Sequence, residues 1–198
     1  MVATAVSPAP AVTVPLPRPP AGEEDAYVSW YEQVLGWTLT GGPPAQLVTG
    51  LRFDVLELPS DAGAALLRRP VATGPVALMG RRMRFLVAAG SADELEGLLD
   101  WLEWGGVALD LAALGVGGRI TAPAPPGTPP SPRGAAVWLR PPEQGCEALL
   151  PALPGPGRGD GPGRGPDLVR LVAAAATECH RARLRRGTAR TGQPLAFS

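Results

Sequence analysis

The chain contains 198 residues with a formal net charge of zero, and every basic residue is an arginine. A neutral chain gives no general case for nucleic-acid or membrane binding, and without lysine it cannot carry a P-loop. Cys146 and Cys179 are far apart and support neither a disulfide framework nor a zinc finger, so we treat both as structural. The sequence shows no signal peptide and no membrane-length apolar run, which predicts a cytoplasmic protein without membrane contact.

Glycine and proline, with 26 and 25 residues, divide the chain into segments. Proline fixes φ and removes a backbone donor, so segments rich in it are expected to stay extended. We therefore expect one α+β domain between disordered Pro/Gly-rich flanks. The composition sets the boundaries: a Pro-rich segment at 1–21, a domain at 22–150, a Gly/Pro linker at 151–165, a C-terminal helix at 166–186 and a tail at 187–198.

Helical and strand periodicities predict the elements of the first half of the domain. Apolar residues at helical spacing run from Ala26 to Leu35, and Gly36 stands where a C-cap belongs. Ser60 is expected to cap a helix that continues to Arg69. Strands are expected at 37–39, 46–49 and 52–58, and a hairpin at 76–79 and 83–89.

The second half opens with Ser91 followed three residues later by Glu94, a capping box that predicts a helix ending before Gly105. Pro166 is placed to start a last helix, whose amphipathic pattern would let it dock on the domain. Strands are expected at 107–111, 119–122 and 135–140, and a short helix at 143–150. Because these elements mix without regular βαβ alternation, the class is α+β.

Four local patterns follow one another along this chain. They are a helix ending in Gly36-Trp37, a Thr49-Gly50 turn before the acid-bearing strand 51–59, a basic hairpin strand at 80–87, and an Asp, Gly-Gly, Ala-Pro series at 110–123. In this order they resemble the bacterial primase–polymerase (prim-pol) domain of the archaeo-eukaryotic primase superfamily, in particular short actinobacterial proteins described as bifunctional DNA primase/polymerases. The resemblance covers roughly residues 26–142, and its most specific part is the series at 110–123.

The resemblance implies an RRM-like, mixed catalytic sheet with flanking helices, and template-directed joining of nucleotides in DNA replication. In the family, an Asp-x-Asp strand and a later acid hold divalent ions, Mg²⁺ or Mn²⁺. A histidine in the hairpin strand contacts the phosphates of the incoming nucleotide. Two hard cations that clamp the attacking and leaving oxygens need several carboxylate oxygens.

Carried onto this chain, the family's acid pair is incomplete. If Glu57 takes the place of the first acid, Pro59 takes the second; if Asp54 takes the first, Leu56 takes the second. Asp54 and Glu57 are three residues apart, so in a strand their side chains point to opposite faces. One carboxylate of the pair is therefore missing under either alignment.

The remaining catalytic positions are only partly retained. The family's histidine position maps to Met83, whereas its later acid is kept as Asp110. Glu57 and Asp110 are the candidate metal ligands that remain. The alternative, which we favour, is that each acid is solvated or pairs with an arginine such as Arg119.

The candidate nucleotide- or phosphate-binding residues are all arginines: Arg81, Arg82, Arg84 and Arg119. Arg82 and Arg84 would share one face of the hairpin strand, with Met83 on the other. Arg68 and Arg69 could extend this patch. Ordinary surface charge around a turn is the alternative, because arginine is the only cation the chain uses.

Aromatic and basic residues elsewhere leave two interpretations open. Trp101 and Trp104 are three residues apart and could stack on bases, although we expect core packing for them, as for Trp30, Trp37 and Trp138. The arginines of 181–190 could hold nucleic acid without sequence preference. They could equally form a solvated helix end, where cations suit the dipole.

Three hypotheses follow. The favoured one is a catalytically degenerate prim-pol-like protein, retained as a nucleotide-binding, single-stranded nucleic-acid-binding or regulatory module without an assigned cofactor. The second is an active nucleotidyltransferase that uses Mg²⁺ or Mn²⁺, against which the missing carboxylate and histidine argue. The third is a scaffold whose Pro-rich flanks recruit proteins.

Overall fold

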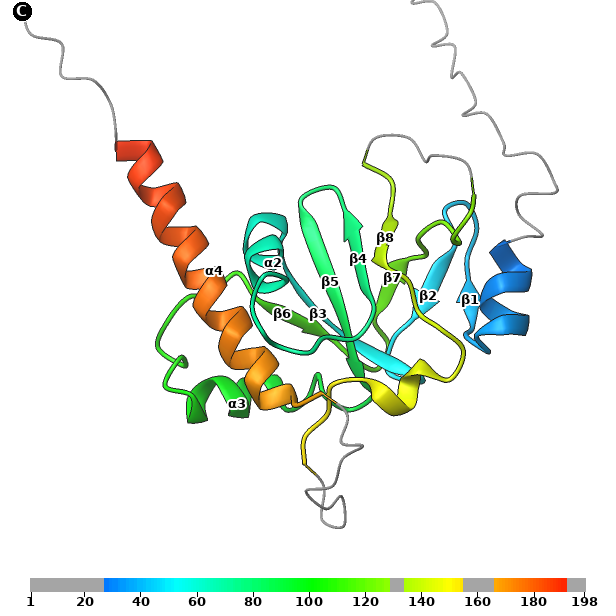
Figure 1. Cartoon of the computed structure of the whole chain (residues 1–198), viewed down its shortest axis with the longest axis horizontal. Helices are drawn as coiled ribbons and strands as arrows, with labels where there is room; N and C mark the ends of the chain where they lie inside the picture. Colours follow the sequence, from blue (N-terminus) through cyan, green and yellow to red (C-terminus); the bar gives the residue numbers. More distant parts are fainter. Residues whose placement is uncertain (1–26, 129–133, 155–165, 192–198) are drawn as a thin grey trace, which may run out of the picture.

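The computed structural model describes residues 27–128, 134–154 and 166–191. The Pro-rich segment 1–21 and most of the linker 151–165 lie outside these residues, so the expectation of disordered flanks falls outside them too. Two antiparallel sheets and a small set of helices make up the described part, which confirms the α+β class (Figure 1). No helix in this part is long and apolar enough to cross a membrane.

The larger sheet has five strands in the order β6-β3-β5-β4-β8, and every neighbouring pair is antiparallel. Its strands are β3 (Phe53–Pro59), β4 (Val76–Met79), β5 (Arg82–Ala88), β6 (Ala112–Leu114) and β8 (Val137–Arg140). Helix α2 (Ser60–Leu66) joins β3 to β4, and helix α3 (Leu95–Trp101) joins β5 to β6. From β3 to β6 the chain thus runs β-α-β-β-α-β, and its four strands lie in the order fourth, first, third, second.

The smaller sheet has three strands in the order β1-β2-β7, also antiparallel. Its strands are β1 (Leu39–Thr40), β2 (Gln46–Val48) and β7 (Arg119–Thr121). A π-helical segment η1 (Ser29–Val34) precedes β1, and a 3-10 turn η2 (Cys146–Leu149) follows β8. The last element is the long helix α4 (Leu168–Thr191).

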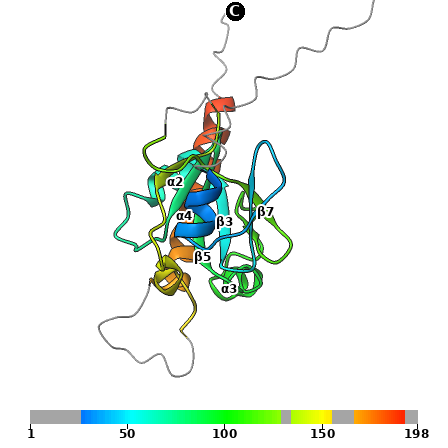
Figure 2. The same ribbon diagram turned by 90° about the vertical axis from the view of Figure 1, so that its right-hand side faces the viewer.

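Three helices, α2, α3 and α4, cover one face of the five-stranded sheet (Figures 1 and 2). Alternate residues of the two central strands form the apolar surface beneath them. Each large side chain that is fully buried there contributes about 1.5–3 kcal/mol. As its amphipathic pattern predicts, α4 docks on this layer, against α2 and α3. The centre of this core is formed by Leu56, Leu58, Met83, Phe85, Val87, Leu171, Val172 and Ala175.

The other face of the sheet is covered by the smaller sheet and η1. Phe53, Val55 and Leu86 pack there in a second apolar cluster with Leu47 and Ile120. The same cluster takes in the side chains expected in the core on aromatic grounds. Trp37 is buried in it, and Trp30 and Trp138 pack against it while partly buried. Along β3, this face carries Phe53, Val55 and then Glu57. It is therefore apolar at the Phe53 end of the strand and polar at the Glu57 end.

Most predicted elements are found within a few residues of their expected positions, but four expectations are wrong. Residues 107–111 form no strand; the edge strand is β6, which begins at Ala112. Two α4 contacts hold the carbonyls just before it: Arg183 Nη1 donates to Ala108 O at 2.6 Å, and Cys179 Sγ donates to Asp110 O at 3.6 Å. These carbonyls therefore face the helix layer instead of a strand.

The other three differences concern two helix starts and one tryptophan. Neither Ser60 nor the expected capping box at Ser91 caps a helix through its side chain; α2 begins at Ser60 itself and α3 at Leu95. Trp101 is 72% exposed, contrary to the core packing expected for it. The side of α3 that faces the core carries Leu95, Leu98, Leu99 and Leu102. At 3.6 residues per turn, Trp101 lies about 110° around the helix from the centre of that stripe.

Candidate functional site

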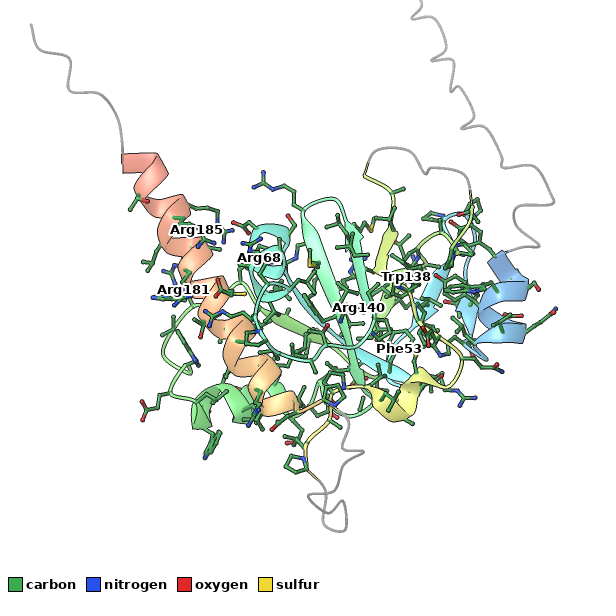
Figure 3. All side chains as sticks on the ribbon, in the orientation of Figure 1. Phe53, Arg68, Trp138, Arg140, Arg181 and Arg185 are labelled. Atoms are coloured by element: carbon green, nitrogen blue, oxygen red, sulfur yellow. The ribbon has the colours of Figure 1, made fainter. Side chains whose placement is uncertain are left out.

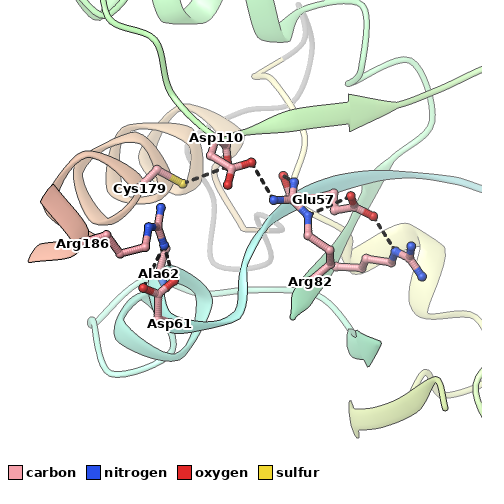
Figure 4. A network of polar contacts seen from close by, with 8 residues as sticks. Glu57, Asp61, Ala62, Arg82, Asp110, Cys179 and Arg186 are labelled. Carbon is pink, nitrogen blue, oxygen red and sulfur yellow. Dashed lines mark hydrogen bonds and ion pairs between the residues drawn. The ribbon is translucent and has the colours of Figure 1, made fainter. Parts of the chain in front are cut away.

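The register of β3 against β5 places Glu57 directly opposite Arg84. Arg84 Nε donates to Glu57 Oε2 at 2.7 Å, and Arg82 Nε donates to Glu57 Oε1 at 3.0 Å. Arg82 also reaches Asp110, where its Nη1 donates to Oδ1 at 2.6 Å. The result is a continuous line of alternating charges, which we call the arginine–carboxylate network: Arg84, Glu57, Arg82 and Asp110 (Figure 4).

Strand periodicity explains why these residues meet. Arg82 and Arg84 are two residues apart, so both point to the face of β5 that is turned away from the helices, as predicted. Asp110 lies on the other side of β3 from β5. It comes two residues before Ala112, which is paired with Glu57 where β6 runs beside β3. Arg82 on β5 therefore reaches across the end of β3, where it binds Glu57, to Asp110, which lies just before β6.

Partial burial and opposite charges set the ionisation of the network. The Glu57 side chain is 19% exposed and that of Arg84 14%. Burial raises the pKa of Glu57, but the hydrogen bonds and charges of Arg84 and Arg82 outweigh it and hold the pKa below its ordinary value. Burial lowers the pKa of Arg82, while Asp110 and Glu57 raise it beyond its ordinary value. Two anions and two cations thus balance within the network.

Asp54 lies on the opposite face of β3, as the strand geometry predicts, and takes no part in the network. It is 1% exposed; its Oδ2 accepts a hydrogen bond from the Ala92 backbone at 2.8 Å. Its Oδ1 has no partner within the described residues. Burial raises the pKa of Asp54, and the opposing backbone hydrogen bonds from Ala92 and Gly90 do not cancel this rise. The folded protein therefore holds the Asp54 proton more tightly than the unfolded chain does.

Met83 is also separated from the acids that the alignment grouped with it. It is buried on the helix-covered face, against α2. Gly63 of α2 lies so close that a Cβ at this position would overlap the Met83 thioether. The structure thus brings together Glu57 and Asp110, and keeps Asp54 and Met83 away from them.

The candidate phosphate-binding arginines are divided between several places. Arg81 lies exposed in the turn between β4 and β5, and its carbonyl accepts a hydrogen bond from the Ser60 backbone at 2.8 Å. Arg119 lies on β7, in the other sheet. Asp110 does pair with an arginine, as we favoured, but the partner is Arg82.

Arg68 and Arg69 do not extend the hairpin patch, contrary to the sequence-based interpretation. Arg69 instead pairs with Glu178 of α4, a buried acid that the sequence analysis missed. Glu178 also pairs with Arg181 at 3.1 Å, three residues further along the same helix. This i, i+3 spacing of opposite charges is the sequence signal that could have identified it.

The network offers little room for a pair of cations. Among residues 27–128, 134–154 and 166–191, no three His, Cys, Asp or Glu side chains gather as metal ligands. Glu57 gives both of its oxygens to arginines, so a divalent ion at Glu57 and Asp110 would have to displace the Arg82 guanidinium. The arrangement can hold three strand ends together and can present guanidinium donors to an anion.

No protein-family model, curated protein or solved structure matches this chain.

Proposed function

We propose that this chain is a prim-pol-like domain that has lost metal-dependent catalysis and acts as a nucleotide- or single-stranded nucleic-acid-binding, regulatory module. The observation that carries the proposal is the position of Arg82 between Glu57 and Asp110. In the family that the sequence resembles, acids at these positions hold divalent ions. Here a guanidinium supplies the positive charge between them, and too few carboxylate oxygens remain for two hard cations.

The strand order supports the RRM-like part of the proposal. A β-α-β-β-α-β path whose four strands lie in the order fourth, first, third, second is the split-βαβ arrangement, to which RRM-like sheets belong. Its two central strands are β3 and β5. Glu57, Arg82 and Arg84 lie on these two strands, on the face away from the helices.

The anion that such a site fits is a phosphate group. Arginine presents a planar fork of donors that matches phosphate oxygens bidentately. Arg81 directly precedes Arg82 in the turn between β4 and β5, is exposed, and has no ion pair within the described part of the chain. We assign it the first contact with a phosphate, while Glu57 keeps Arg82 and Arg84 in place on the adjoining strand β5.

Template-directed incorporation of deoxynucleotides with Mg²⁺ or Mn²⁺ tests the catalytic half of the proposal. We expect no product, because Arg82 neutralises both acids. Reproducible product that is lost in Asp110→Ala would contradict the proposal and favour an active nucleotidyltransferase. Product that persists in Asp110→Ala would indicate a contaminating polymerase, and the measurement would be repeated on protein freed of it.

Binding of a fluorescein-labelled single-stranded DNA at low salt tests the other half. We expect salt-dependent binding that Arg81→Gln weakens by roughly threefold or more, about the effect of losing one phosphate contact. Arg52→Gln, which removes an exposed arginine elsewhere, is the matched control and should leave binding unchanged. Absence of any binding at low salt would favour the scaffold hypothesis, whose Pro-rich segment 1–21 lies outside the described residues.

A further inference from the structure

Four arginines gather where α2 and α4 lie side by side, in the helix layer of the molecule. We call them the helical arginine patch: Arg68, Arg69, Arg181 and Arg185. The two helices run antiparallel, since Asp61 near the start of α2 pairs with Arg186, and Arg69 just after α2 pairs with Glu178. Arg68, Arg181 and Arg185 can be followed in Figure 3. The patch lies on the far side of the five-stranded sheet from Glu57 and Arg84.

A single buried acid organises the patch. Glu178 Oε1 accepts hydrogen bonds from Arg69 Nε at 2.9 Å and from Arg181 Nη1 at 3.1 Å. Burial raises the pKa of Glu178, but Arg69 and Arg181 outweigh it, so the pKa is lowered and the acid stays ionised. One carboxylate against four arginines leaves a charge of 4 − 1 = +3 on the patch.

The charge of the patch is directed toward solvent. Arg68 and Arg185 are exposed, and neither has an ion pair within the described residues. Arg181 and Arg185 share one side of α4, about 6 Å apart along its axis. Arg183 points to the other flank of the helix, toward Ala108 O, and does not belong to the patch.

We propose that the helical arginine patch binds the phosphate backbone of nucleic acid without reading its sequence. Guanidinium forks suit phosphate oxygens, and neither α2 nor the stretch of α4 from 177 to 188 offers a Trp, Tyr or Phe on which a base could stack. Leu184 is the only large apolar side chain exposed on that stretch, which is too little for insertion into a lipid surface. The patch is a second surface, and it binds whether or not Arg81 and the network do.

The test uses the full chain and a matched pair of double variants. Arg68→Gln/Arg185→Gln removes the two unpaired arginines of the patch. Arg52→Gln/Arg170→Gln removes two exposed arginines elsewhere and changes the net charge by the same amount. The probe is a fluorescein-labelled single-stranded DNA, titrated at several salt concentrations, and circular dichroism checks that both variants are folded.

The patch variant should bind on the order of tenfold more weakly at low salt, and the slope of log K against log salt should shrink by about 1.4, the loss of two phosphate contacts. The control should bind as the parent does. Equal weakening in both variants would overturn the proposal, because it would show only a bulk charge effect. Unchanged DNA binding in the patch variant would also overturn the proposal. The same holds if the patch variant loses binding to phosphatidylserine vesicles while its DNA binding stays intact.

Failure of this proposal and failure of the proposed function give different results. If Arg81→Gln weakens DNA binding and the patch variant does not, the sheet-end site binds and the patch does not. If the patch variant weakens binding and Arg81→Gln does not, the patch binds and the role assigned to Arg81 is wrong.

Discussion

The two ends of β3 each carry one acid, and the two acids respond to burial in opposite ways. Asp54, near the start of the strand, is fully buried, one of its oxygens has no partner among the described residues, and its pKa is raised. Glu57, three residues later, is partly buried between two arginines, and its pKa is lowered. Burial alone penalises the charged form of both. The direction of the net shift is set by what lies across the strand.

That difference comes from the pairing of β3. Asp54 is opposite Val87, which offers no cation. Within the described residues the donors near its carboxyl are backbone groups, those of Ala92, Gly90 and Gly50. Glu57 is opposite Arg84 and also binds Arg82, which lies two residues before Arg84 on the same strand. A strand can therefore raise the pKa of one acid and lower the pKa of another that lies about 10 Å further along it.

The largest expected effect comes from removing the acid that the arginines share. Glu57→Ala leaves the half-buried Arg82 and Arg84 without their common partner, and we expect the free energy of unfolding to fall by about 3 kcal/mol. Urea unfolding followed by tryptophan fluorescence measures this. The double variant Glu57→Ala/Arg84→Ala should lose less than the sum of the two single variants, because the groups interact directly. A loss below about 0.5 kcal/mol for Glu57→Ala would mean that the network acts as an ordinary surface ion pair.

The orientation of the side chains on β3 and β5 could be predicted from the sequence. The opposite orientations of Asp54 and Glu57, and the shared face of Arg82 and Arg84, followed from strand periodicity alone. The docking of α4 followed from its apolar stripe. These are local properties, which the order of residues along one element fixes.

The partners of those residues could not be predicted in the same way. The pairing of Glu57 with Arg84 depends on the register between β3 and β5, which a one-residue shift would invert. The pairing of Asp110 with Arg82 depends on β6 lying at the edge of the sheet beside β3, and that of Arg69 with Glu178 on the docking of α4. Each of these joins segments at least 25 residues apart, so the contacts follow only once the fold is known.

A smaller effect of opposite sign is expected at the other end of β3. Asp54→Asn keeps the shape of the side chain and an acceptor for the Ala92 N–H, but removes the charge that is buried without a cation. We expect the variant to be more stable than the parent at pH 7, by about 1 kcal/mol. The measurement is urea unfolding of both proteins across a range of pH.

The pH dependence of the stability gained by Asp54→Asn shows whether the gain comes from removing the charge or from a change in packing. Because the folded protein holds the Asp54 proton more tightly than the unfolded chain, the contribution of this group to stability is fully present below the ordinary pKa of 3.8. It is lost as the pH rises through the higher folded value, so the advantage of Asp54→Asn should vanish in acid and grow toward neutrality. Glu57→Gln should show the reverse, since the contribution of Glu57 is present above its ordinary pKa of 4.5 and is lost as the pH falls through the lower folded value. The two cysteines do not disturb the measurement. Burial raises the pKa of Cys146 to about 11 and that of Cys179 to about 12, so neither thiol ionises in this pH range. If the stability of the two variants, relative to the parent, changed with pH in the same direction, the two ends of β3 would not differ in the way described.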